Sequence, residues 1–187
     1  MAANIGIVRI TNTGASQVTA EISGGNTVAN ADDNHYSVAT TSSNPVRIPA
    51  AGTNYSYWVS TRLIAYTNPA GTINNIRWYT NGANNFGTGV AAIFNQSTTY
   101  HQAGGTVGTS GTQLTLVNHT ALLAAPVDPF GYSVGGSPSF PVTGSITFGS
   151  ATPAQFGNYV VYQLSVGTTA QPGATGSATF TWLYDET

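Results

Sequence analysis

Apolar and polar residues alternate along this chain with a period of two, in short runs separated by Gly, Pro and Asn. This period is typical of β-strands, whereas the i, i+3, i+4, i+7 spacing of an amphipathic helix is hard to find anywhere. About nine or ten strand-like runs occur with turn signals between them. The pattern predicts an all-β fold: a single antiparallel β-sandwich domain over residues 1–187, of jelly-roll or immunoglobulin-like topology.

Two pairs of runs are predicted to be strand partners. Residues 5–12 and 17–23 flank a Gly-Ala-Ser turn and indicate an opening hairpin. Residues 55–67 form the longest β-rich run, with apolar and aromatic residues on both alternating faces, so we expect a central strand covered on both sides. Because residues 68–71 (NPAG) have turn chemistry, residues 73–80 are predicted to be the return strand beside it.

The chain ends on clear strand patterns rather than on a polar tail. Residues 158–167 and 177–187 are strand-like and flank a Pro-Gly turn. Phe180, Trp182 and Tyr184 fall on one face of the last run, which predicts a strand that contributes to the core. Trp58 and Trp78 also lie within strand patterns, and core packing is the favoured role for all three tryptophans.

A long loop is predicted at Val127–Gly144, where Pro, Gly and aromatic residues occur without period. Loops of this length inside compact domains are usually functional or disordered. Asp128, directly before a proline, is predicted to cap a turn with its side chain. Partner contacts are expected from this loop, from the N-terminal segment and from the acidic C-terminus, and the candidate residues are Ile5, Ile7, Phe130, Tyr132, Phe140, Asp185 and Glu186.

Two roles are open for the acidic pair at the C-terminus, Asp185 and Glu186. Charges at the end of a last strand discourage edge-to-edge aggregation. Alternatively, they pair with an arginine of a neighbouring subunit. Either role makes this end of the chain a candidate boundary between copies or partners.

Charge is scarce in this sequence: 5% of residues are Asp, Glu, Lys or Arg, against about 25% in an ordinary soluble domain. There is no lysine, and the four arginines are spread singly, so neither a nucleic-acid backbone nor an anionic membrane is an expected partner. No apolar run approaches the roughly 20 residues of a membrane helix. With a net charge of −2, little repulsion keeps copies apart, which suits a component of an assembly and predicts a homo-oligomer.

Enzyme chemistry has little support in the sequence, and a non-enzymatic protein without a cofactor is predicted. The nucleophile elbow G-x-S-x-G is absent, and lysine-dependent phosphate loops and Schiff bases are impossible. The best polar cluster is ADDNHY, where Asp32, Asp33 and His35 could ligate Ca²⁺ or a transition metal. A solvated loop is the favoured alternative, so no metal site is predicted.

Two segments, NPAGTINNIRWYTNG and the closing YVVYQLSVGTTAQPGATGSATFTWLYDET, resemble virion structural proteins of tailed bacteriophages. The resemblance is carried by Tyr159–Gly167, Pro172-Gly173 and Thr179–Glu186. It implies a capsid-associated β protein of the decoration or cement type, which binds a major capsid protein or other virion subunits on the surface of a head lattice. It further implies a virion location, after assembly in the host cytoplasm, in keeping with the lack of a conventional secretory signal.

Two other non-enzymatic functions remain open. A carbohydrate-binding or adhesin-like sandwich of a tail fibre would stack exposed Tyr and Trp rings on sugars. A subunit of an extracellular filament would exchange a terminal strand with its neighbour. These alternatives differ from the decoration protein in what they must expose: coplanar aromatic rings in the first, and an N- or C-terminal strand that can complete a neighbour's sheet in the second.

Overall fold

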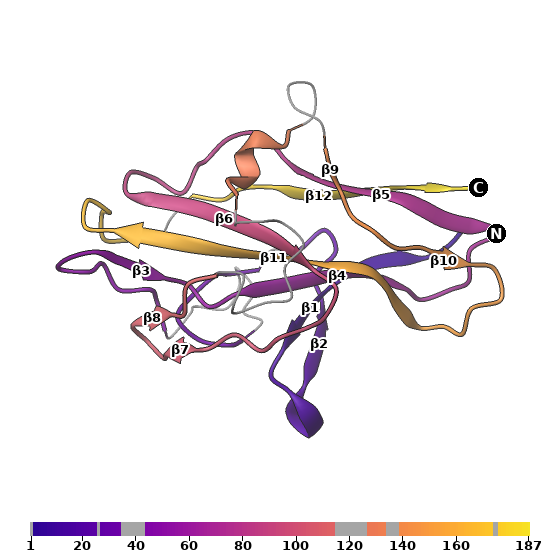
Figure 1. Cartoon of the computed structure of the whole chain (residues 1–187), viewed down its shortest axis with the longest axis horizontal. Helices are drawn as coiled ribbons and strands as arrows, with labels where there is room; N and C mark the ends of the chain where they lie inside the picture. Colours follow the sequence, from indigo (N-terminus) through magenta and orange to yellow (C-terminus); the bar gives the residue numbers. More distant parts are fainter. Residues whose placement is uncertain (1, 26, 35–43, 115–126, 134–138, 174–175) are drawn as a thin grey trace.

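The fold is described from a computed structural model, which covers residues 2–25, 27–34, 44–114, 127–133, 139–173 and 176–187. Its described residues contain strands and two single-turn 3-10 helices, η1 (Gly14–Ser16) and η2 (Pro129–Gly131). The strands are β1 (Ile5–Thr11), β2 (Val18–Glu21), β3 (Thr53–Tyr55), β4 (Val59–Ala65), β5 (Thr72–Thr80), β6 (Val90–Ser97), β7 (Gly105–Thr106), β8 (Ser110–Gly111), β9 (Phe140–Pro141), β10 (Ile146–Thr147), β11 (Ala154–Gly167) and β12 (Phe180–Glu186). The predicted all-β sandwich-like fold is confirmed (Figure 1).

The larger sheet is built around β11, which pairs β6 along one edge and β4 along the other. β1 lies beside β4, and β2 lies beside β1, so the predicted opening hairpin is confirmed. The run predicted as one strand over residues 55–67 is interrupted: β3 and β4 both pair β11, with residues 56–58 between them. β4 is nevertheless central, and six of its seven residues are buried, as its two-sided apolar pattern predicts.

The smaller sheet has β5 in the middle, with β12 on one side and the short strands β9 and β10 on the other. The predicted pairing of residues 55–67 with residues 73–80 is therefore wrong. The turn at residues 68–71 carries the chain from one sheet to the other, because both runs have an apolar face that needs the same core. A hairpin turn and an inter-sheet turn have the same local chemistry, so the sequence did not distinguish them.

The main core lies between the two sheets and contains Trp78, Phe94 and Phe140. The ring of Phe94 lies 4.8 Å from that of Trp78 and 5.0 Å from that of Phe140, measured between centroids. A second cluster, with Trp58 and Leu114, covers the other face of the larger sheet. Trp58 and Trp78 are thus core residues as predicted, and Trp182 is partly buried against the main core.

One side of the sandwich is closed by residues 127–133 and 139–142. Phe94 and Val127 exchange backbone hydrogen bonds of 2.9 and 3.0 Å on β6, and the amide of Thr80 on β5 donates to the carbonyl of Tyr132 at 2.7 Å. β9 then pairs β5. The loop predicted at Val127–Gly144 therefore joins the two sheets, with residues 134–138 outside the described part. On the opposite side, β12 ends the smaller sheet.

Candidate interaction surface

Both termini lie at one end of the molecule, together with two loops (Figure 1). This terminal end comprises residues 2–4, 69–71, 148–150 and 186–187. The amide of Thr72 donates to the carbonyl of Thr187 at 2.8 Å, and the amide of Phe148 donates to the carbonyl of Gly71 at 2.6 Å. A Cβ atom on Gly71 would lie 1.7 Å from the carbonyl oxygen of Thr187, so only glycine permits this approach. Local backbone contacts thus fix the C-terminus between two loops.

The carboxylate of Glu186 accepts hydrogen bonds from two other segments of the terminal end. Oε1 accepts a hydrogen bond of 2.9 Å from the amide of Ala70, and Oε2 accepts a longer one of 3.5 Å from the amide of Ala3. Its side chain remains exposed. A shallow hollow beside it is lined by Ala2, Ala70, Gly71, Glu186 and Thr187. The acidic residue predicted as a partner contact therefore also holds the chain's own N-terminal segment.

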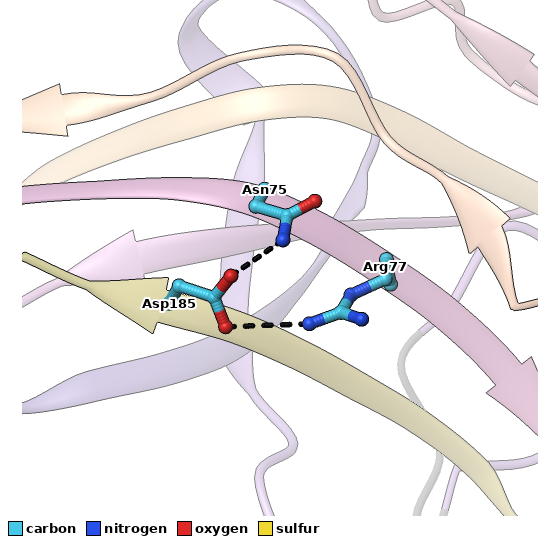
Figure 2. A network of polar contacts seen from close by, with 3 residues as sticks. All are labelled: Asn75, Arg77 and Asp185. Atoms are coloured by element: carbon cyan, nitrogen blue, oxygen red, sulfur yellow. Dashed lines mark hydrogen bonds and ion pairs between the residues drawn. The ribbon is translucent and has the colours of Figure 1, made fainter.

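Asp185 contacts two residues of β5 (Figure 2). Its Oδ1 lies 3.3 Å from Nη2 of Arg77, and its Oδ2 accepts a hydrogen bond from Nδ2 of Asn75. The arginine that pairs with it in this structure belongs to the same chain, whereas a neighbouring subunit's arginine was one of the two predicted roles. The ion pair is 34% and 46% exposed, so its contribution to stability is below about 1 kcal/mol.

Asn75 marks a β-bulge opposite this carboxylate. The register moves from Leu183 opposite Arg77 to Asp185 opposite Asn74, so β5 has one more residue than β12 at this point. Asn75 takes a positive φ of 49°, which non-glycine residues other than Asn and Asp rarely adopt. The bulge lets Ile73 and Ile76 both face the core although they are three residues apart.

Replacing Asn75 by valine is expected to destabilise the fold by about 1–3 kcal/mol, since a β-branched residue is strained at positive φ. Asn75→Gly is the matched control: it loses the hydrogen bond to Asp185 but keeps the backbone conformation, and its cost is expected below about 1 kcal/mol. Urea unfolding of both variants measures the difference. Equal stability of the two would contradict the assigned strain.

The other candidate contact residues are partly or fully buried in this structure. Ile5 and Ile7 of β1 are partly buried and pack against the main core, and Tyr132 does the same from the closing segment. Phe130 is partly buried, with its ring 6.1 Å from that of Phe86. Phe140 is only 5% exposed, so its side chain has almost no surface to offer. Asp128 caps η2 as predicted, accepting from the amide of Phe130 at 2.9 Å.

Phe148 is the exposed aromatic residue that the sequence analysis missed. Its side chain is 73% exposed, the largest exposure among the large hydrophobic residues in the described ranges. It sits in the turn after β10, beside a second shallow hollow lined in part by Ile146, Ser150 and Phe156. The signal was present as a lone aromatic residue within the turn-forming sequence TFGS.

Asp32 and Asp33 make protein contacts in the structure. Oδ2 of Asp32 accepts from Nδ2 of Asn44 at 2.6 Å, and Oδ2 of Asp33 accepts from the amide of Asn12 at 2.8 Å. His35, the third member of the weighed metal set, lies outside the described residues. Across the described ranges, no group of three or more His, Cys, Asp or Glu residues could hold a metal ion.

A buried arginine lies near these aspartates. Arg9 on β1 is 0% exposed, and its Nη1 donates to Oγ1 of Thr27 and to the carbonyl of Val28, both at 2.8 Å. Burial lowers the pKa of Arg9, while the acidic groups of Tyr162, Asp33 and Asp32 raise it in part. Through these hydrogen bonds, the buried guanidinium of Arg9 holds residues 27–28 against the larger sheet.

A tyrosine and a carboxylate meet near the terminal end. The hydroxyl of Tyr66 donates to Oε2 of Glu21, which raises the pKa of Tyr66 to about 12. Burial acts to raise the pKa of Glu21, but hydrogen bonds from Ser23 and Tyr66 outweigh it, so that pKa is lowered. Tyr66 is 37% exposed, yet its hydroxyl is engaged within the chain.

Comparisons with known proteins found no matching family model, no similar curated protein and no similar solved structure. In the described part of the chain, no helix is long and apolar enough to cross a membrane.

Proposed function

We propose that this chain is a non-enzymatic structural protein of a virion, of the capsid decoration or cement type, which docks on a head lattice through its terminal end. The observation that carries the proposal is Phe148, which is 73% exposed and whose amide donates a hydrogen bond to the carbonyl of Gly71 beside the C-terminus. A large exposed aromatic residue is an anchor that binding surfaces commonly use. The partner is a major capsid protein or another virion subunit.

The neutral surface supports docking on a protein lattice. Only 5% of residues are charged, and the net charge is −2, so many copies can lie close together without strong repulsion. Desolvating hydroxyl and amide groups costs less than desolvating ions, provided that hydrogen bonds replace water. Many copies of a chain with this nearly uncharged surface would thus be able to occupy neighbouring sites on a regular lattice.

The two alternatives have less support in the geometry. Stacking on sugars needs exposed, coplanar Trp or Tyr rings, and among the described residues the exposed aromatic side chains are Tyr66 and Phe148. Trp58 and Trp78 are buried. For a filament built by strand exchange, a terminal strand must leave its own sheet, yet both terminal segments are fixed here by hydrogen bonds within the chain.

The first experiment is detection of the protein in virions. Immunogold labelling of negatively stained particles, with mass spectrometry of the same particles, is expected to place it on heads. Binding of the purified chain to heads that lack it gives the affinity. Absence of the protein from virions, together with no binding of the purified chain to heads, would contradict the proposal.

Phe148→Ser is expected to weaken binding to such heads by about 10–100-fold, the range of a moderate anchor residue. Val107→Ser is the matched control, because Val107 is 61% exposed in the turn between β7 and β8, away from the terminal end (Figure 1). Its affinity should equal that of the wild type. Both side chains are too exposed to affect folding, so equal binding by all three proteins argues against docking through this end.

A further inference from the structure

The strand β12 has one edge without a backbone partner in the described part of the chain. It pairs β5 on one side and ends the smaller sheet on the other. None of its residues is fully buried, although Phe180, Trp182 and Tyr184 all turn toward the main core. The core under this strand is therefore incompletely covered at its outer side.

The hydrogen bonds at both ends of the β5–β12 ladder show which amides face outward. Thr187 exchanges bonds of 2.8 and 2.9 Å with Thr72, and the carbonyl of Thr179 accepts from Asn81 at 3.1 Å. In an antiparallel pair such residues alternate with residues whose backbone groups point away. The extra residue of the bulge lies on β5, so the alternation along β12 is unbroken. The N–H and C=O groups of Phe180, Trp182 and Tyr184 therefore point to the free edge.

Most of this edge lacks the usual protection against pairing, since its two acidic residues, Asp185 and Glu186, stand at its end. Natural edge strands carry charges, proline or bulges of their own, or are very short. Residues 179–184 (TFTWLY) contain neither charge nor proline, and the chain has no lysine. In the larger sheet, the edge strand β2 is shorter than β12, with four residues against seven, and the edge strand β6 is bridged at Phe94 by Val127. In the described part of the chain, β12 thus offers a seven-residue edge that is open to a further strand.

We infer that β12 pairs with β12 of a second copy, antiparallel about a two-fold axis at Trp182. In that register Phe180 lies opposite Tyr184 of the other copy, and the outward backbone groups of all three aromatic residues find partners. Asp185 falls opposite Thr179 of the other copy, so no like charges meet. A second copy fits this edge because, in this register, the strand pairs with itself without placing like charges opposite each other.

Solvent-facing positions in the same register provide the test. Position 183 of one copy lies opposite position 181 of the other, and Leu183 is 43% exposed on that face. Thr181→Glu with Leu183→Glu places two carboxylates directly opposite two others, which destabilises a strand pair. Within one chain, position 183 lies opposite Arg77, so the new carboxylate there is acceptable to the monomer.

Sedimentation from about 1 μM to 1 mM is expected to show a monomer–dimer equilibrium that stops at the dimer. Thr181→Glu/Leu183→Glu should raise the dissociation constant about tenfold or more. Thr181→Lys/Leu183→Glu puts opposite charges across the axis and should keep the dimer. Ala15→Glu/Gln17→Glu adds the same charge in the exposed turn before β2 and should have no effect.

Amide hydrogen exchange tests the pairing in the unaltered protein. The amides of Phe180, Trp182 and Tyr184 should be protected at high concentration and exchange faster on dilution, while those of Thr181 and Leu183, bonded to β5, stay protected throughout. A wild type that is monomeric over the whole range, or a dimer in which these three amides exchange freely, overturns the inference. The pairing does not depend on the virion role, since head binding and solution size are measured separately.

Discussion

Replacing Gln163 by leucine is expected to destabilise the protein by about 3–5 kcal/mol. Gln163 lies on β11 and is 0% exposed. Its Oε1 accepts from the amide of Leu114 at 2.8 Å, and its Nε2 donates to the carbonyls of Ser56 and Thr112 at 2.6 and 2.8 Å. Leucine fills nearly the same volume but leaves the Leu114 amide and the Ser56 carbonyl buried without these partners, at about 1–3 kcal/mol each.

Gln155→Leu is the matched control for this substitution. Gln155 lies on the same strand but is half-buried, and its side chain makes no hydrogen bond with the described residues. Its unfolding free energy in urea should stay within about 0.5 kcal/mol of the wild type. An equally small loss of stability in Gln163→Leu would show that the hydrogen bonds of Gln163 do not hold β11 to the residues between β3 and β4.

Alkaline pH is expected to unfold the protein between about pH 10 and 12, because buried tyrosines must ionise. Burial raises the pKa of Tyr162 to about 12, and the charge of Arg9 lowers it only in part. Burial also raises the pKa of Tyr100, with Asp33 adding to the effect, and that of Tyr57. Lysine and cysteine are absent, so no lysine or cysteine side chain obscures this titration.

The direction follows from linkage. A phenol whose pKa is raised in the folded state contributes stability that is fully present below its unfolded pKa of about 10 and is lost as the pH rises through the folded value. For Tyr162, with two units of difference, the loss is about 3 kcal/mol. Denaturant midpoints measured from pH 8 to 12 should therefore be flat at first and then fall.

Tyr162→Phe separates ionisation from packing. The substitution keeps the ring, whose centroid lies 4.7 Å from that of Phe180, and removes the proton. Stability at pH 7 should be close to that of the wild type, and the loss at pH 12 should be smaller by about 2 kcal/mol. A variant that follows the wild-type curve up to pH 12 would show that this phenol is not among the groups responsible.

Local patterns predicted the elements well where the period was unbroken. The hairpin of β1 and β2, the two-sided burial of β4, and the inward face of β12 were all predicted from alternation and turn residues. The spacing of Ile73, Ile76 and Trp78 also contained the signal of a bulge, since the alternation changes phase at Asn74-Asn75. The bulge at Asn74-Asn75 could therefore have been predicted from the local sequence, but it was not.

The exposure of the candidate contact residues could not be predicted from local patterns, because exposure is a property of the packed molecule. Phe140 and Phe148 both lie in segments rich in turn residues, but the first is 5% and the second 73% exposed. The difference arises because β9 places Phe140 against Phe94 in the core, whereas Phe148 lies at the tip of the turn after β10. Each is an aromatic residue among turn-forming neighbours, so the local sequence alone does not say which of the two is buried.

The sequence by itself determined the β class, most strand positions and a nearly uncharged surface, because these depend on side-chain alternation and composition. Only the tertiary structure decided which strands pair, that residues 68–71 cross between sheets, and that β12 is left with an open edge. Pairing depends on which apolar faces can share one core, and many arrangements satisfy the same local pattern. The closing strand TFTWLYDE is thus a core element from its sequence, and only the fold shows that one of its edges has no strand partner among the described residues.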